Sequence, residues 1–295
     1  MIILTLIVCL LAERFFKPLQ SKRNFGWFSG YQTFIHYIFK KLNYKQGKIA
    51  ALLILFPAPF IVGYIDLKLY QLFLPLEFLF SSAILLYSFG PQPFFSHCKN
   101  FITSQEEKDQ DAAMENASKI LNRKLYSEEK NQLNKTITKS LFDISNTRIF
   151  GVVFWFVLLG PMGALLYRCV SLLQQESEQE KTNGQQPPEA FTLAVQLFHD
   201  IINWLPSRLT AFGYAAMGNF IGAINYCENY EKLLIQLQNQ SNEQLLSCMG
   251  AGAINMPKEE KDCEVETVNL CIAIIRRNIM LWLGTISILT LAGWL

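Results

Sequence analysis

The stretch Phe150-Gly-Val-Val-Phe-Trp-Phe-Val-Leu-Leu-Gly-Pro-Met-Gly-Ala-Leu-Leu-Tyr167 decides the fold of this chain, and Arg168 follows it directly. It contains no charged residue, and its length approaches the twenty or so apolar residues that an α-helix needs to cross a hydrocarbon core. Gly160-Pro161 lies near its middle. Because proline has no backbone N–H to donate, this pair predicts a break. We therefore predict a membrane-spanning helix that is interrupted.

The composition extends this conclusion to the whole chain. Of the 295 residues, 51% are apolar and only 17% are charged, whereas a soluble domain carries about 25% charged residues. The mean hydropathy is +0.20. The net charge of +2 does not indicate a nucleic-acid partner. We predict an all-α, polytopic helical membrane protein, with the lipid bilayer as its partner and with amphipathic and soluble helices besides its spans.

Other apolar segments predict further spans, at about residues 1–16, 49–65, 69–90 and 278–295. Residues 49–65 and 69–90 should form a hairpin across Asp66-Leu67-Lys68, and Pro57 and Pro59 should kink its first helix. A sixth candidate, residues 209–223, is less apolar. Its Gly218-x-x-x-Gly222 suits close helix packing, although a helix on the surface fits equally well. We therefore expect four to six transmembrane helices.

The polar segments divide the chain into three parts. Residues 1–96 hold the first spans, residues 97–148 form a cytoplasmic helical segment, and residues 149–295 form a membrane region. In the middle part, helices are expected from Gln105 to Leu125 and from an N-cap at Ser127 to Phe142.

Two loops bear on topology and order. The loop from Glu13 to Lys48 carries eight Lys and Arg residues against one acid, which by the positive-inside rule predicts that it is cytoplasmic. The protein should thus be multi-pass, with its N-terminus on the outer side of the membrane. The Gln- and Glu-rich insert at residues 174–188 is expected to be disordered. The side of the membrane that residues 168–277 face stays open.

Polar groups within apolar surroundings mark a candidate site. They are Arg168 and, within Phe198-His-Asp-Ile-Ile-Asn-Trp-Leu-Pro-Ser-Arg208, the residues His199, Asp200, Asn203 and Arg208. Each costs free energy to desolvate unless it has a partner. Helical spacing places Asp200, Asn203 and Ser207 near one face.

Two interpretations of this site remain open. In the first, Asp200 or Glu13 pairs with Arg168, Arg208 or Arg14 and holds the helices together. In the second, Arg168 and Arg208 bind an anionic ligand, since arginine suits bidentate binding of phosphate or carboxylate.

No sequence motif indicates a metal, a cofactor or a catalytic residue. The chain lacks a Walker loop, a nucleophile elbow and a dinucleotide fingerprint. The seven cysteines are odd in number and scattered, with no Cys-x-x-Cys, which argues against a disulfide framework or a zinc site. We expect most of them to pack as small apolar residues.

Two motifs resemble a known superfamily. Gly160-Pro-Met-Gly-Ala-Leu-Leu-Tyr-Arg168 and Asp200-Ile-Ile-Asn-Trp-Leu-Pro-Ser-Arg-Leu-Thr210 are similar to the pattern shared by AmpE and the adenosylcobinamide-phosphate synthases. Ala-Glu-Arg-Phe-Phe at residues 12–16, Asn146-Thr-Arg-Ile-Phe-Gly-Val-Val-Phe-Trp155 and Arg276-Arg-Asn-Ile-Met-Leu-Trp-Leu resemble AmpE more closely, and the likeness runs nearly end to end.

The AmpE resemblance implies an inner-membrane sensor or signalling modulator of β-lactamase induction, linked to cell-wall recycling and to the response to antibiotic. It implies the amidase AmpD as a partner and a muropeptide or phosphorylated ligand. Arg168, His199, Asp200, Asn203 and Arg208 would bind that ligand. Glu13, Arg14 and Asn146 are secondary candidates. The alternatives are a membrane-bound ligase or transferase of the cobinamide-phosphate synthase type and a purely structural interaction module.

The chain also departs from the synthase pattern. It has Arg148 and Ile149 where the synthases carry an acidic residue, and Val170-Ser-Leu-Leu where they read Asn-Thr-Leu-Asp. It has His199-Asp200 in place of a paired Asp. A ligase that handles nucleotide and metal needs such carboxylates, so the resemblance favours ligand binding over catalysis.

Overall fold

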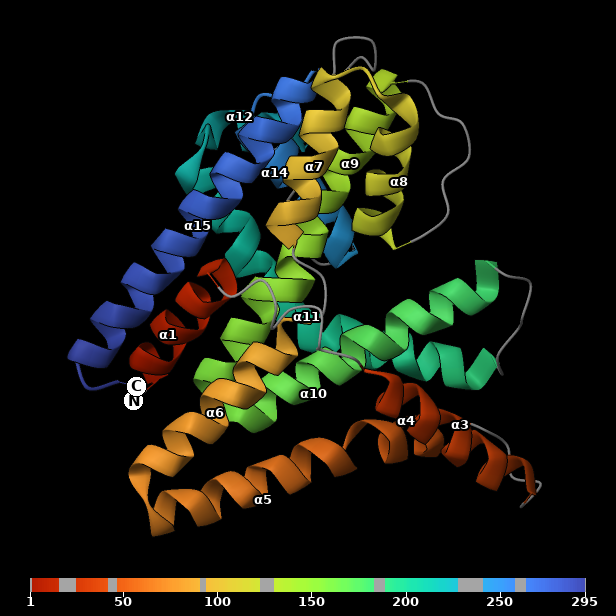
Figure 1. Ribbon diagram of the computed structural model, residues 1–295, viewed down its shortest axis with the longest axis vertical. Coiled ribbons are helices and arrows are strands. Elements are labelled where there is room, and N and C mark those ends of the chain that lie inside the picture. The colour runs from red at the N-terminus through yellow and green to blue at the C-terminus, as the bar shows by residue number, and fades with distance from the viewer. Residues whose placement is uncertain are drawn as a thin grey trace. The chain divides into compact units, whose positions relative to one another are not determined.

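The computed structural model describes residues 2–15, 25–41, 47–90, 94–122, 130–182, 189–227, 241–257 and 264–294. Within these ranges the regular structure is entirely helical and no strand occurs, which confirms the all-α prediction. The chain forms two compact units. The first unit consists of residues 1–91, 147–203 and 292–295, and the second of residues 92–146 and 204–291. Figure 1 shows the helices of each.

The first unit is built around α10 (Gly151–Thr182), which packs against α5 (Pro57–Leu72) and α6 (Leu74–Ser88). Helix α6 also contacts α1 (Ile2–Phe15), and α3 (Gly26–Lys41) contacts α4 (Lys48–Leu55). The α5–α6 hairpin is seen at the bottom of Figure 1. The apolar core of this unit includes Phe28, Ile54, Leu165 and Val195.

The second unit is a helix bundle. Its members are α7 (Phe94–Glu106), α8 (Gln110–Leu121), α9 (Lys130–Ser145), α12 (Phe220–Tyr226), α14 (Asn242–Ala253) and α15 (Val265–Leu291). Helix α9 packs against α14 and α15, while α7 packs against α8 (Figure 1). A π-helical turn, η1 (Asn146–Phe150), follows α9. Helix α11 (Glu189–Met217) belongs to the first unit up to Asn203 and to the second unit from Trp204.

Three helical stretches are long and apolar enough to cross a membrane: Lys48–Leu72, Lys130–Gln179 and Val265–Leu291. Two shorter apolar helices, Ile2–Ala12 and Leu74–Ser88, accompany them. The protein is therefore an all-α membrane protein. The last long helix begins at Val265, well before the predicted start at residue 278.

The two predicted helix breaks are present. Pro57 occupies the first turn of α5 after Phe56 ends α4, so the missing N–H of proline falls where no helical partner is needed. At Gly160 the backbone adopts φ 65° and ψ −153°, directly before Pro161. This conformation suits glycine because it has no Cβ.

The predicted hairpin turn at Asp66–Lys68 is wrong. These residues lie inside α5, and the turn falls at Phe73, whose extended backbone precedes Pro75 in the first turn of α6. The helix predicted from Gln105 to Leu125 is also interrupted. Lys108 has φ 59°, and the Asp109 carboxylate accepts a hydrogen bond of 3.0 Å from the Ala112 N–H, so Asp109 caps a new helix. Ser127 lies outside the described residues.

Part of the insert predicted to be disordered is helical. Helix α10 continues to Thr182, and Gln174 donates a 2.9 Å hydrogen bond to Glu178 one turn later. Glutamate, glutamine and lysine favour helices, and this composition extends the helix. Residues 183–188 lie outside the described ranges. The sixth candidate, residues 209–223, is not one helix, because α11 ends at Met217 and α12 begins at Phe220.

The cysteines agree with the prediction only in part. Cys9, Cys98, Cys169 and Cys271 are buried thiols that take part in no disulfide, as expected of packing residues. One pair departs from the expected packing role, since Cys227 at the end of α12 forms a disulfide with Cys248 of α14. The two cysteines lie 21 residues apart in sequence, and the packing of α12 against α14 brings them together.

A series of buried polar side chains links the helices of the second unit. The Thr210 hydroxyl donates to Asn146 Oδ1 at 2.9 Å, and Asn278 Nδ2 donates to the Thr210 carbonyl at 3.1 Å. All three residues are completely buried. A Cβ added to Gly213 would collide with the Asn278 side chain, so this glycine allows α15 to approach α11 closely.

Candidate functional site

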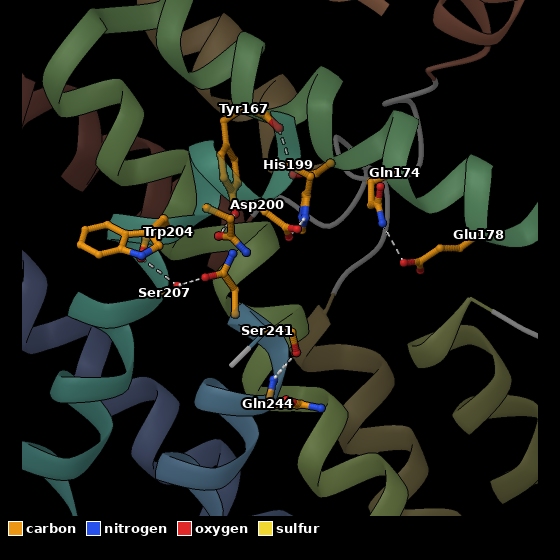
Figure 2. A network of polar contacts seen from close by, with 12 residues as sticks. Tyr167, Gln174, Glu178, His199, Asp200, Trp204, Ser207, Ser241 and Gln244 are labelled. Atoms are coloured by element: carbon orange, nitrogen blue, oxygen red, sulfur yellow. Dashed lines mark hydrogen bonds and ion pairs between the residues drawn. The ribbon is translucent and has the colours of Figure 1, made fainter. Parts of the chain in front are cut away.

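The central motif of the first unit brings Tyr167 and Asn203 together. The Tyr167 hydroxyl donates to Asn203 Oδ1 at 3.0 Å, and both side chains are buried. Figure 2 shows the tyrosine pointing along this bond. Trp155 Nε1 donates to the Ile202 carbonyl at 3.1 Å, which also holds α11 against α10. Gly151 leaves the space that the tyrosine ring occupies.

Replacing Tyr167 with phenylalanine removes this hydrogen bond and keeps the ring. We expect a loss of about 1 kcal/mol in the free energy of unfolding, the usual contribution of a buried neutral hydrogen bond. Thermal unfolding in detergent micelles measures it. Tyr37→Phe, at an exposed position of α3, is the control and should leave the unfolding temperature unchanged. Equal unfolding temperatures for both variants would contradict the role given to the Tyr167 hydroxyl.

Arg168 is a buried cation. Its side chain is only 7% exposed, and its Nε has no hydrogen-bond partner within the described part of the chain. No carboxylate of those residues lies within ion-pair distance of it. This excludes, for Arg168, the interpretation in which an acid of the described residues holds it. A buried guanidinium that lacks such a partner is costly to keep, so the fold retains it at a price in stability.

Aromatic groups surround Arg168. Its guanidinium lies 5.3 Å from the centre of the Phe25 ring, and that ring lies 4.5 Å from the Tyr87 ring. Trp27 Nε1 donates to the Tyr87 hydroxyl at 2.7 Å. A Cβ on Gly90, which has φ 90°, would approach Arg168 Nη2 to 2.6 Å. This arrangement places a buried cation beside aromatic rings.

His199 and Asp200 form a weak pair on α11. His199 Nδ1 lies 3.7 Å from Asp200 Oδ1, and the two side chains are 18% and 50% exposed (Figure 2). Asp200 is exposed, whereas Asn203 and Ser207 are completely buried, so Asp200 lies at the solvent-exposed border of the face that the three residues share. Three residues of helix rotate a side chain by about 300°, which places Asp200 about 60° away from Asn203.

Arg208 belongs to a cluster in the second unit. Its Nη1 donates to the Trp204 carbonyl at 2.9 Å and to Asn242 Oδ1 at 3.1 Å, and its guanidinium stacks 4.2 Å from the centre of the Trp204 ring. Ser207 donates to the same Asn242 oxygen at 3.0 Å. Asn242 begins α14, just after the N-cap Ser241. Ser241 accepts a bond from the Gln244 N–H, seen in Figure 2.

Asn242 should stabilise this cluster, because one oxygen accepts from both Ser207 and Arg208. Asn242→Ala removes this shared acceptor while Ser207 keeps the Trp204 carbonyl at 3.0 Å, so we expect a loss of about 1 kcal/mol, the usual contribution of a hydrogen bond. Thermal unfolding measures the loss, and Asn269→Ala at an exposed position of α15 is the control. An unchanged unfolding temperature for Asn242→Ala would show that the cluster contributes nothing.

The remaining candidates are placed as follows. Asn146 accepts from Thr210 and lies in the second unit. The side chains of Glu13 and Arg14 lie outside the described residues. Arg168, His199, Asp200 and Asn203 belong to the first unit, and Arg208 to the second. Among the described residues, no three His, Cys, Asp or Glu side chains gather as metal ligands.

The sequence interpretation missed three residues that the structure brings to these clusters: Tyr167, Thr210 and Asn242. Tyr167 lies inside the motif that was interpreted as a broken span. Only the neighbouring Arg168 could have indicated that Tyr167 belongs to the site. Asn242 lies 34 residues from Arg208, and no local pattern connects them. Thr210 is the last residue of the second motif. Its spacing of seven residues from Asn203, about two helical turns, could have placed it on the same side of the helix.

The fold and these clusters define a helical membrane protein whose polar side chains are turned inward. A comparison with protein families agrees: the CobD/Cbib protein family model matches residues 10–257. Because this range covers well over half of the 295 residues, the chain belongs to that family. No solved structure matches it significantly.

Curated relatives carry the same family name. The cobalamin biosynthesis protein CobD of Chromobacterium violaceum is 27% identical over 144 residues, which is 49% of this chain and 45% of that protein. The probable cobalamin biosynthesis proteins CobD of Pyrococcus abyssi and Thermococcus kodakarensis are 25% and 26% identical. Each match covers 65% of this chain and 63% of the relative. The chain thus spans less than two thirds of the length of these relatives.

These comparisons contradict the predicted role in β-lactamase induction. The matching family and relatives are named for CobD and cobalamin biosynthesis. They support the superfamily that the motifs indicated, but they do not support AmpE, signalling, or AmpD and muropeptides as partners. The two central motifs are shared by the whole superfamily, and the AmpE assignment therefore rested on the segments at residues 12–16, 146–155 and 276–283, which did not separate its branches.

Proposed function

We propose that this protein is a membrane-bound ligase of the cobinamide-phosphate synthase type, which acts in cobalamin biosynthesis as a multi-pass protein of the bacterial inner membrane. The family match over residues 10–257 carries the proposal. The three relatives named for cobalamin biosynthesis support it. A ligase of this type joins a carboxyl group to an amine as an amide.

The site of the first unit supplies binding and orientation for such a reaction. Arg168 receives an anionic group of a substrate, since its Nε is buried and has no partner among the described residues. Phe25 and Tyr87 exclude water around it, which strengthens the attraction. Tyr167 fixes the Asn203 side chain through its hydrogen bond. Groups held in this way align reactants before the bond forms.

The residues do not fit a resident metal ion. Divalent cations in ligases that activate a carboxyl group are held by carboxylates. No cluster of three ligating side chains occurs in the part of the chain that the structure describes. We derive no step through a metal at this site.

A second candidate function is ligand binding without turnover. It is favoured by three positions where the resemblance leads us to expect acids: Arg148, Leu173 and His199. With these carboxylates absent, the anion site at Arg168 is retained while groups needed for activation are lost. The ligand would then be a phosphorylated or carboxylated compound of the same pathway.

Complementation separates the two candidates. The full chain is expressed in a bacterium that lacks its cobinamide-phosphate synthase, and growth that depends on new cobalamin is measured. Restored growth is the expected result for the ligase. Arg168→Lys should abolish it, because an ammonium cannot replace the planar guanidinium, whereas Arg277→Lys on the exposed side of α15 should retain it.

Growth that is not restored, with the chain present in the membrane at the level of the host enzyme, would reject the ligase. Binding of a cobinamide by that purified chain would then support the second candidate. A chain that neither restores growth nor binds would reject both.

A further inference from the structure

The anion site proposed for Arg168 is closed in this structure. Its side chain is only 7% exposed, and its Nε is buried without a hydrogen-bond partner in the described part of the chain. A phosphate or carboxylate oxygen must come within about 3 Å of a guanidinium nitrogen to bind it. Binding therefore requires that a group covering Arg168 moves aside.

Two groups of the first unit lie close to the guanidinium. One is the backbone of Gly90, where an added Cβ would approach Nη2 to 2.6 Å. Gly90 directly follows Ser88 and Phe89, which are 0% and 5% exposed, so the core holds this segment in place. The other is the Phe25 ring, whose centre lies 5.3 Å from the guanidinium carbon. Phe25 is only partly buried, which makes it the cover with more freedom to move.

Contacts near the surface hold Phe25 at the start of α3. Its ring lies 4.5 Å from the Tyr87 ring. Two residues later, Trp27 donates a 2.7 Å hydrogen bond from Nε1 to the Tyr87 hydroxyl. The Trp27 side chain is 44% exposed, so water competes for this bond. We call Phe25, Trp27 and Tyr87 the aromatic gate.

The rest of α3 is anchored. Phe28, Ile35 and Phe39 are at most 9% exposed and belong to the apolar core of the first unit. They follow at intervals of seven and four residues and so share one side of the helix. Segments at helix ends open at much lower free energy than segments packed in a core. A movement of Phe25 and Trp27 can therefore stay within the first turn of α3.

We propose that the aromatic gate controls access to Arg168. Opening of the first turn of α3 breaks the hydrogen bond between Trp27 and Tyr87, moves Phe25 off the guanidinium and admits an anionic group. The gate rests on the proposed anion-binding role of Arg168 and adds a step that precedes binding. An anion favours the open form, because its charge-assisted hydrogen bonds replace a weaker contact between the guanidinium and an aromatic ring.

Chemical modification of Arg168 measures how often the gate is open. Phenylglyoxal reacts covalently with guanidinium groups that it can reach, and peptide mass spectrometry gives the rate at each arginine of the full chain in micelles. In the wild-type protein, Arg168 should react far more slowly than the exposed Arg277. Trp27→Phe removes the hydrogen bond of the gate. It should speed the reaction of Arg168 by about fivefold, the population change that one hydrogen bond of usual strength produces.

Tyr87→Phe removes the same bond from its other end. The variant with both substitutions should react about as fast as either single variant, because the two residues share one interaction. Tyr37→Phe, at an exposed position of α3, is the matched control and should keep the wild-type rate. Equal rates at Arg168 in the Trp27→Phe and Tyr37→Phe variants would overturn the gate. A wild-type Arg168 that reacts as fast as Arg277 would also overturn it.

A second readout separates opening of the gate from general loosening of the first unit. Cys9 of α1 is a completely buried thiol in the same unit. Its reaction with N-ethylmaleimide should stay at the wild-type rate in the Trp27→Phe variant. Faster labelling of Cys9 together with Arg168 would show that the unit loosens as a whole, and this would reject the gate.

Inorganic phosphate tests the anion site separately from the gate. Phosphate that binds Arg168 should slow its modification in both the wild-type protein and the Trp27→Phe variant. Faster modification in Trp27→Phe without protection by phosphate would retain the gate and reject only anion binding at Arg168. None of these measurements depends on ligase activity.

Discussion

Replacing Arg168 with methionine should stabilise the protein while it destroys anion binding. The buried guanidinium has an Nε without a partner in the described residues and aromatic neighbours in place of an acid. An apolar side chain of similar length removes that cost, so we expect a gain of about 1–4 kcal/mol in the free energy of unfolding. Binding of inorganic phosphate to the protein in micelles, followed by titration calorimetry at low salt, should weaken by about tenfold or more.

The opposite signs of these two effects distinguish function from structure. Residues kept for function commonly reduce stability. If Arg168 instead holds the fold together, Arg168→Met will lower the unfolding temperature. Arg277→Met is the control, because Arg277 is exposed, and surface changes usually stay within about 0.5 kcal/mol. A loss of stability with unchanged phosphate binding would contradict the anion site.

Gly160→Ala should lower the free energy of unfolding of the first unit by a large amount for a single substitution. Gly160 has φ 65° and ψ −153°, a conformation available almost only to glycine, and other residues held there lose about 1–3 kcal/mol. Space is not the cause, because the nearest atom to an added Cβ, Asp66 Oδ2, lies 3.8 Å away. The unfolding temperature in micelles measures the effect.

A second glycine provides the matched control for this prediction. Gly284 lies within α15, and an added Cβ there meets no atom within 4 Å. Alanine favours a helix over glycine by up to about 1 kcal/mol, so Gly284→Ala should leave stability unchanged or raise it. If both variants unfold at the same temperature, alanine is tolerated at the Gly160 backbone conformation and the prediction is wrong.

Much of the fold could be predicted because the apolar runs and proline breaks of membrane helices are visible in the local sequence. The apolar run before Arg168, the break at Gly160-Pro161 and the kink at Pro57 depend on neighbouring residues alone. The hairpin turn was misplaced because Asp66 and Lys68 are charged, and charge was taken as a sign of a loop. In the structure Ser81 donates to Asp66 Oδ1 at 2.9 Å, so a neighbouring helix satisfies this carboxylate and α5 continues past it.

The candidate site was only partly predictable. The sequence marks Asn203 as a polar residue in an apolar frame, but its partner Tyr167 lies 36 residues away. Such a pair depends on how α10 and α11 pack, and one sequence does not reveal it. Arg168 was predicted to be either paired or ligand-binding. The choice between those alternatives depends on which side chains surround it, which spacing does not encode.

Asn278 also links the structure to the order in which the chain is made. It lies on α15, which is synthesised after α9, α11 and α14, yet its amide donates to the carbonyl of Thr210 and its side chain fills the space beside Gly213. Until α15 is synthesised, the second unit lacks both this donor and this packing partner. Its bundle can therefore close only after translation has passed Asn278. A chain truncated before this residue lacks these contacts, so we expect it to be degraded more readily by cellular proteases.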